Sequence, residues 1–154
     1  MKILCATDFS EAGQAAEQQA LELAGALGAE LVYVHVSAEA MLYRGVAFAV
    51  TDAQRVYDAQ RRWAEDTLAA RVAAAGQRGV PARSVLRVGV PFDQIVDAAR
   101  DERADMLVLG THGRTGLDRL LMGSVAERVV RLAPCPVLTV RPRITEPQTL
   151  KRTA

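Results

Sequence analysis

Residues 106–110, Met106-Leu107-Val108-Leu109-Gly110, are the stretch of sequence that decides the fold. Four apolar residues in a row that end at a glycine are typical of a strand covered on both faces, as strands of parallel sheets are. Further short apolar runs, rich in β-branched residues, predict four more strands, at residues 3–6, 31–36, 85–88 and 137–140.

Helical spacing of apolar residues fills the intervals between these runs. The first helix is predicted to follow Ser10 as its cap and to end at Gly28, and three more are predicted at residues 51–75, 92–103 and 125–132. Strands that alternate with helices form a parallel sheet, because parallel strands need crossover connections. The sequence therefore predicts a single α/β domain, an open five-stranded parallel sheet with helices on both faces. Ligands of such sheets bind outside the carboxyl ends of the strands, where the strand order reverses.

Composition narrows the classes of function. The chain has 154 residues, 50% of them hydrophobic, and its 19 basic and 18 acidic side chains give a net charge of +1. This balance gives no broad attraction for nucleic acid, and aromatic residues, at 5%, are few for base-stacking platforms. The longest apolar run, residues 46–50, is far short of the ~18 residues of a membrane span. We expect a cytoplasmic protein with reduced Cys5 and Cys135, no partner among nucleic acids or membranes, and no metal site built by the protein.

A glycine-rich segment follows the deciding strand: Gly110-Thr111-His112-Gly113-Arg114-Thr115-Gly116, and then Gly123-Ser124 at the start of the next predicted helix. Glycines let the backbone approach a ligand, and the first N–H groups of a helix favour a phosphate. The spacing fits neither a Walker A loop nor a dinucleotide fingerprint. Arg114 is the only cation adjacent to these glycines.

The pattern Gly-x2-Gly-x9-Gly-Ser, made by Gly110, Gly113, Gly123 and Ser124, resembles the ATP-binding branch of the universal stress protein family. Landmarks in the same order extend the resemblance over residues 1–142: residues 6–10, 35–36, 88–91 and 136–140. The resemblance implies the strand order 3-2-1-4-5, which places the reversal beside Asp8 and Gly110. Residues 143–154 are then a flexible C-terminal tail.

The resemblance also implies a site for ATP, or for ADP or AMP, with Mg²⁺ or Mn²⁺ held through the phosphates. Asp8 would bind the ribose hydroxyls, and the backbone of Val36 would meet the adenine. The helix start at Ser124 would hold the triphosphate, with charge added by Arg114. Ala6 stands where family members often have proline. The residues implied to bind nucleotide are Ala6, Thr7, Asp8, Val36, Leu109, Gly110, Gly113, Arg114, Gly123, Ser124, Val125 and Ala126.

Several of these residues also have a purely structural explanation. Residues 124–127, Ser-Val-Ala-Glu, match a capping box, which would engage the Ser124 hydroxyl within its own helix. Asp8 can serve a turn at the strand end, although the fold rule favours a ligand there. His35 and His112 are predicted to have no function of their own, and Trp63 is predicted to be packed.

The predicted loop contains no Glu or Gln that could position a water molecule for hydrolysis. We therefore expect an ATP-binding regulatory or stress-response protein rather than an efficient ATPase. Slow hydrolysis or self-phosphorylation, and a nucleotide-free interaction module of the same fold, remain alternatives.

The last strand, Val137, Leu138, Thr139 and Val140, is predicted to be a sheet edge that pairs in a homodimer, as the resemblance also implies. The long connection at residues 37–50 is expected to act either as a lid or as a partner surface, and the sequence does not choose between them.

Overall fold

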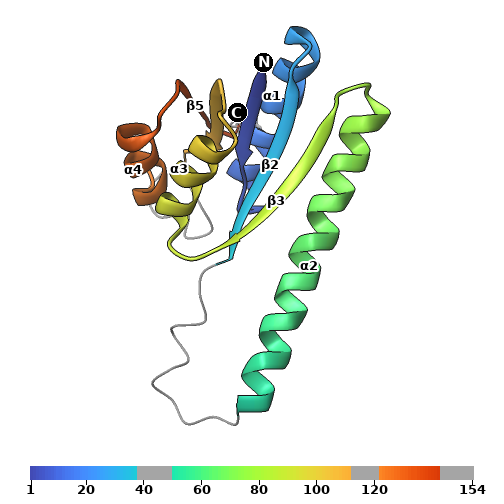
Figure 1. Cartoon of the computed structure of the whole chain (residues 1–154), viewed down its shortest axis with the longest axis vertical. Coiled ribbons are helices and arrows are strands. Elements are labelled where there is room, and N and C mark those ends of the chain that lie inside the picture. Colours follow the sequence, from blue (N-terminus) through green and yellow to red (C-terminus); the bar gives the residue numbers. More distant parts are fainter. Residues whose placement is uncertain (38–49, 112–121, 143–154) are drawn as a thin grey trace, which may run out of the picture.

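Five parallel strands form one sheet, and two helices cover each of its faces (Figure 1). The computed structural model describes residues 1–37, 50–111 and 122–142. Along the chain the elements are β1 (Lys2–Ala6), α1 (Glu11–Leu27), β2 (Glu30–Ser37), α2 (Val50–Gln77), β3 (Ala82–Val88), α3 (Pro91–Asp101), β4 (Met106–Gly110), α4 (Ser124–Leu132) and β5 (Val137–Val140). None of the helices in these ranges is long and apolar enough to cross a bilayer.

The strand order is β3-β2-β1-β4-β5, and every neighbouring pair is parallel. β1 is central: Ile3 stands opposite Leu31 of β2 on one side and Met106 of β4 on the other. This order confirms the fold that the sequence and the family resemblance predicted. The order reverses between β1 and β4, so a crevice opens beyond their carboxyl ends.

The core has two layers because successive strand residues point to opposite faces of the sheet. Ile3 and Cys5 pack with α1 and α2 on one face. Leu4 and Ala6 pack with α3 and α4 on the other face. Both faces of β1 are therefore buried, as its uninterrupted apolar sequence predicted.

The ends of α1 follow the sequence prediction closely. The Ser10 hydroxyl caps the helix start by accepting a hydrogen bond of 3.2 Å from the Gly13 N–H. Gly28 ends the helix in the left-handed conformation, with φ at 61°, and its N–H donates to the Ala24 carbonyl. The two caps fix where the chain enters and leaves the helix.

The third strand differs most from its prediction. It begins at Ala82 rather than at residue 85, and Arg83 and Ser84 pair with Val32 and Tyr33 of β2. β3 is an edge strand whose residues are half-buried or exposed, so polar residues fit there and the apolar pattern starts late. The helix bounds differ from their predictions by at most two residues at either end: α2 covers Val50–Gln77, α3 covers Pro91–Asp101, and α4 begins at Ser124.

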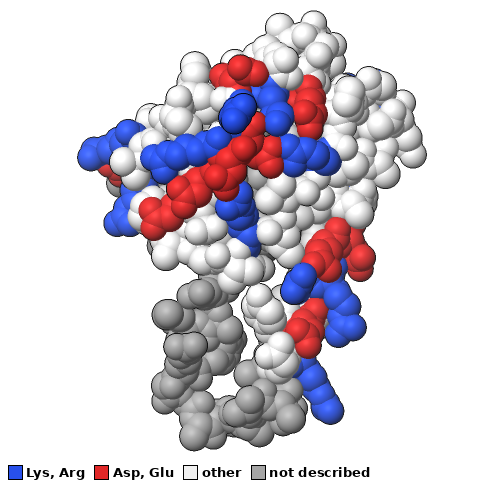
Figure 2. Space-filling view, viewed as in Figure 1, with Lys and Arg blue, Asp and Glu red and all other residues white. Residues whose placement is uncertain are grey.

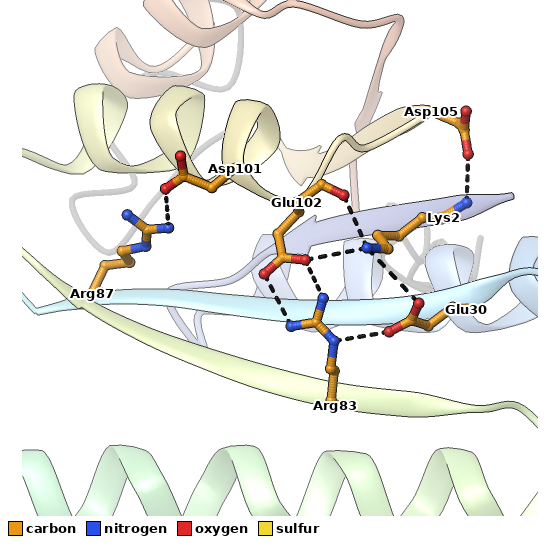
Figure 3. A network of polar contacts seen from close by, with 7 residues as sticks. All are labelled: Lys2, Glu30, Arg83, Arg87, Asp101, Glu102 and Asp105. Atoms are coloured by element: carbon orange, nitrogen blue, oxygen red, sulfur yellow. Dashed lines mark hydrogen bonds and ion pairs between the residues drawn. The ribbon is translucent and has the colours of Figure 1, made fainter.

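Charged side chains join the amino ends of the strands, at the edge opposite the crevice (Figure 3). Glu102, after α3, binds Arg83 of β3 and accepts a hydrogen bond of 3.3 Å from Lys2 Nζ of β1. Arg83 Nε lies 2.8 Å from Glu30 Oε1 of β2, and the Lys2 backbone N–H donates to Asp105. The hydrogen bonds from Arg83 hold the pKa of Glu102 below its ordinary value of 4.5. On the face seen in Figure 2, acidic and basic side chains lie interleaved.

Candidate functional site

A cavity of about 940 Å³ opens at the carboxyl ends of the central strands. Its volume lies within the range of small-molecule and cofactor sites. Ten of the twelve residues predicted to bind nucleotide line it: Ala6, Thr7, Asp8, Val36, Leu109, Gly110, Gly123, Ser124, Val125 and Ala126. The other two, Gly113 and Arg114, lie outside the described residues. The fold thus brings together segments that are distant in the sequence.

The start of α4 forms one end of the cavity. Gly123 is the N-cap, in an extended conformation, and as a glycine it has no side chain with which to cap the helix. The Gly123 N–H donates to the Thr111 carbonyl at 2.8 Å, which fixes the entry to the helix. The N–H groups of Ser124, Val125 and Ala126 have no intrahelical carbonyl to donate to, because they belong to the first turn. Backbone donors and the positive end of the helix dipole therefore meet at the cavity, an arrangement that suits an anion.

The capping-box interpretation of Ser124 is wrong. A capping serine must stand one residue before the helix, and Gly123 occupies that position while Ser124 is the first helical residue. Glu127 instead forms an exposed ion pair with Arg131 of the next turn, at 2.9 Å. The Ser124 hydroxyl is thus not used as the N-cap, and Ser124 is one of the residues that line the cavity.

Asp8 serves the turn that the sequence predicted as one alternative, and it also borders the cavity. Its Oδ1 accepts hydrogen bonds from the Ser10 N–H at 3.1 Å and the Ser10 hydroxyl at 2.6 Å, so it does stabilise the turn into α1. It also lines the cavity. The backbone of Gly13 in α1 lies close to the Asp8 carboxylate, and only glycine leaves room for this approach, since a Cβ on residue 13 would lie 2.8 Å from Asp8 Oδ1.

Gly110 has a packing role beside any role at the cavity. A Cβ on Gly110 would lie 2.8 Å from both the carbonyl carbon and the carbonyl oxygen of Ala12 in α1. Backbone atoms cannot move aside as a flexible side chain can. The end of β4 and the start of α1 therefore approach so closely that only glycine fits between them.

A buried polar chain fixes the loop after β1. The Thr7 hydroxyl donates a hydrogen bond of 2.5 Å to Glu17 Oε1, and it accepts one of 3.1 Å from the Phe9 N–H. Arg71 Nε of α2 donates to the other Glu17 oxygen at 2.6 Å. Glu17 is only 6% exposed, and these hydrogen bonds satisfy its buried carboxylate oxygens. Sequence analysis missed this chain because Glu17 stands among the alanines of α1 with no pattern of its own.

Three aromatic rings form a cluster at the cavity wall. Phe9 stacks on His35 with ring centroids 4.5 Å apart, and the edge of Phe9 meets Trp63 of α2 at 5.1 Å. The buried His35 places Nδ1 2.8 Å from the Thr7 carbonyl, so Nδ1 carries the proton that it donates. His35 is held by its neighbours, as predicted, and His112 lies outside the described residues. Trp63 is not fully packed, because 51% of its surface is exposed.

α2 contributes a wall that sequence analysis did not predict. Tyr57, Gln60, Trp63 and Ala64 line the cavity from successive turns of this helix. Their spacing of three and four residues places them on one helical face. That spacing was visible in the sequence, but nothing in it showed which side of a mostly polar helix meets the cavity.

The cavity has little of what a protein-built metal site needs. Asp8 is the only acidic residue among the described residues that line it. No group of three or more metal-ligating side chains occurs in the described ranges. A divalent cation at this place would need ligands from a bound phosphate and from water.

Comparisons with known proteins agree with this arrangement. Residues 1–141 match the model of the universal stress protein family. The universal stress protein MJ0531 of Methanocaldococcus jannaschii is 34% identical over 140 residues, which cover 91% of this chain and 81% of that protein. The structure of universal stress protein UspA from Lactobacillus plantarum has a TM-score of 0.79 and 26% identity, covering 92% of this chain and 97% of that one. An Arabidopsis thaliana family protein solved with AMP bound has a TM-score of 0.68 at 21% identity, covering 97% of each chain. The chain therefore belongs to the universal stress protein family.

Proposed function

We propose that this chain binds an adenine nucleotide, ATP, ADP or AMP, in the cavity at the end of β1 and β4. The observation that carries the proposal is the start of α4, where the N-cap Gly123 offers no capping side chain and the residues of the first turn line the cavity at the reversal of strand order. The bound AMP of the Arabidopsis relative supports the same class of ligand.

The residues present fit a nucleotide in one orientation. The phosphates would lie over Gly123 and Ser124 at the start of α4. The start of α1 also borders the cavity, but the Ser10 hydroxyl already caps it by accepting from the Gly13 N–H. Asp8 would accept from the ribose hydroxyls and Val36 would meet the base. Mg²⁺ or Mn²⁺ would be held by phosphate oxygens and water, because the described lining offers the single carboxylate of Asp8. Arg114 and Gly113 would complete the phosphate side.

The proposed role is regulatory binding rather than efficient hydrolysis. An ATPase needs a group that positions the attacking water and a charge that stabilises the transferred phosphoryl group. Asp8, the one acid of the described lining, already accepts two hydrogen bonds from Ser10.

We propose that the functional unit is a cytoplasmic homodimer of residues 1–142, joined through the β5 edge, with residues 143–154 as a tail.

Ser124 offers a sharp test of the phosphate site. Aspartate at this first helical position favours the helix dipole and should leave the fold as stable or up to about 1 kcal/mol more stable. The same charge should repel the phosphates and weaken ATP binding at least about tenfold. Ser124→Ala is the matched control that removes the hydroxyl without adding charge, and we expect a smaller loss.

The measurements are adenine nucleotide retained by the purified protein, titration with a fluorescent ATP, and urea unfolding of each variant. Unchanged ATP binding in Ser124→Asp would place the phosphates elsewhere. A wild-type protein that neither retains nor binds adenine nucleotide would support the nucleotide-free interaction module instead.

A further inference from the structure

Trp63 occupies an unusual position for a large apolar side chain. It is the only tryptophan in the chain, it stands in α2, and half of its surface is exposed although it lines the cavity. The core contacts of α2 begin at the next residue, the buried Ala64, and continue at Leu68 and Ala75. Trp63 is therefore directed by the helix to the cavity wall and not to the centre of the core.

The neighbours of Trp63 hold it in a defined aromatic wall. Phe9 and the indole of Trp63 form a T-shaped pair with the ring planes at 84°, and Phe9 also stacks on His35 with the planes at 29°. Phe9 has φ at 63°, a left-handed conformation that is costly for a bulky residue and clusters at functional sites. The His35 ring is fixed in turn by its bond to the Thr7 carbonyl. The wall is thus anchored to the loop that also carries Asp8.

The aromatic wall, formed by Phe9, His35 and Trp63, and the start of α4 belong to the layers on opposite faces of the sheet. Phe9 packs with the α1 and α2 layer of the core, whereas Val125 packs with the α3 and α4 layer. Both border the same cavity. A ligand with an anionic group at α4 can therefore place an apolar, planar part against the rings of the other layer.

We propose that Trp63 is a specificity-determining residue that stacks on the base of the bound nucleotide. This inference rests on the proposed function and adds to it a reason why the site takes nucleotides rather than phosphate anions alone. A base that stacks on an aromatic side chain gains dispersion and apolar burial that inorganic phosphates lack. Gln60 and Tyr57, about one and two turns earlier on the same helical face, also line the cavity and extend the wall.

The experiment compares two ligands, ATP and inorganic tripolyphosphate, in wild type, Trp63→Ala and Trp63→Phe, by calorimetry. Trp63→Ala should weaken ATP about tenfold and leave tripolyphosphate unchanged, and Trp63→Phe should recover most of the ATP affinity. Arg61→Ala, which changes an exposed residue of the same helix paired with Glu65, should affect neither ligand. In wild type, ATP should quench the fluorescence of this single tryptophan and tripolyphosphate should not.

The outcomes separate the two proposals. If wild type binds ATP and Trp63→Ala binds it equally well, the stacking role is overturned while the nucleotide site stands. An equal loss for ATP and tripolyphosphate would also overturn it, because it would show a general effect on the site. If wild type binds neither ligand, the proposed function fails and this inference fails with it.

Discussion

The Thr7 hydroxyl donates a 2.5 Å hydrogen bond to the buried carboxylate of Glu17, and so ties the loop after β1 to α1. Arg71 holds the other carboxylate oxygen from α2. One side chain thereby links a loop of the candidate site to both helices on that face of the sheet. Such a link should affect stability and site geometry together.

Removal of Arg71 tests this link. Arg71→Ala leaves the buried Glu17 carboxylate without its counterion, and we expect a loss of about 1–3 kcal/mol in the free energy of unfolding, because Arg71 itself is part-exposed. Urea unfolding measures it. Arg61→Ala, which breaks an exposed pair with Glu65 on the same helix, should change stability little. Equal losses in the free energy of unfolding for the two substitutions would show that the burial of Glu17 does not increase the contribution of its ion pair.

Gly110 and Gly76 form a second matched pair. Gly110→Ala should destabilise the protein by about 1–3 kcal/mol, since the new Cβ would meet the backbone of Ala12. Gly76→Ala places a methyl group in open space near the end of α2 and should stabilise by up to about 1 kcal/mol. Thermal unfolding distinguishes them. A tolerated alanine at Gly110 would show that β4 and α1 can separate at no cost.

The contacts of Glu102 predict a pH dependence of stability. The pKa of Glu102 is lower in the folded state than its ordinary value of 4.5. The ionised Glu102 therefore makes its whole contribution to stability at pH values above 4.5. This contribution is lost as the pH falls through the folded-state pKa. Wild type should therefore exceed Glu102→Gln in stability at pH 7, and the difference should shrink as the pH falls below 4.5.

Urea unfolding at several pH values measures this difference. Glu127→Gln, which removes an exposed pair with Arg131, is the control and should stay close to wild type throughout. A Glu102→Gln difference that is constant down to the acid limit would contradict the assigned role of the Arg83 contact.

The proposed homodimer through β5 predicts that substitutions at this edge strand lower the molecular mass of the protein in solution. The carbonyls of Pro136 and Val140 accept bonds from Leu107 and Thr111, so the alternate residue Thr139 directs its backbone groups away from β4. Thr139→Pro should remove an outward donor without breaking the β4 ladder. Val140→Glu should add charge at the end of the same edge. Both should shift the protein to monomer in light scattering, with circular dichroism as the check on folding.

Leu138→Pro is the counterpart that affects the inward side. It should break the β4 pairing and unfold the edge, whatever the state of assembly. A dimer that survives both Thr139→Pro and Val140→Glu would place the interface on another surface.

Sequence predicted the fold where local chemistry decides it. The uninterrupted runs of β1 and β4 and the caps at Ser10 and Gly28 depend on near neighbours, and the structure has them as predicted. The start of β3 was missed because Arg83 pairs at an exposed edge, where no apolar pattern is required. Strand order followed from the family resemblance, since periodicity does not say which strands are neighbours.

The site was predictable in its loops and not in its wall. Ser124 and Asp8 follow strands, and the fold rule places them at the crevice. The helix start at Gly123 depends on the bond to the Thr111 carbonyl, which local sequence does not reveal, so the cap was assigned to the wrong residue. Trp63 lines the cavity from α2, and the sequence does not reveal which face of that helix meets the cavity.

The length of α2 has a consequence for how such a site can diverge. The helix has 28 residues, about 42 Å, and it extends past the carboxyl ends of the strands in Figure 1. Residues 54–63 are exposed or half-buried, whereas the buried contacts with the sheet begin at Ala64. Substitutions in residues 54–63 can therefore change which ligands the cavity accepts, while the half of the helix from Ala64 onward keeps its contacts with the sheet. New ligand preferences can thus evolve without loss of folding stability.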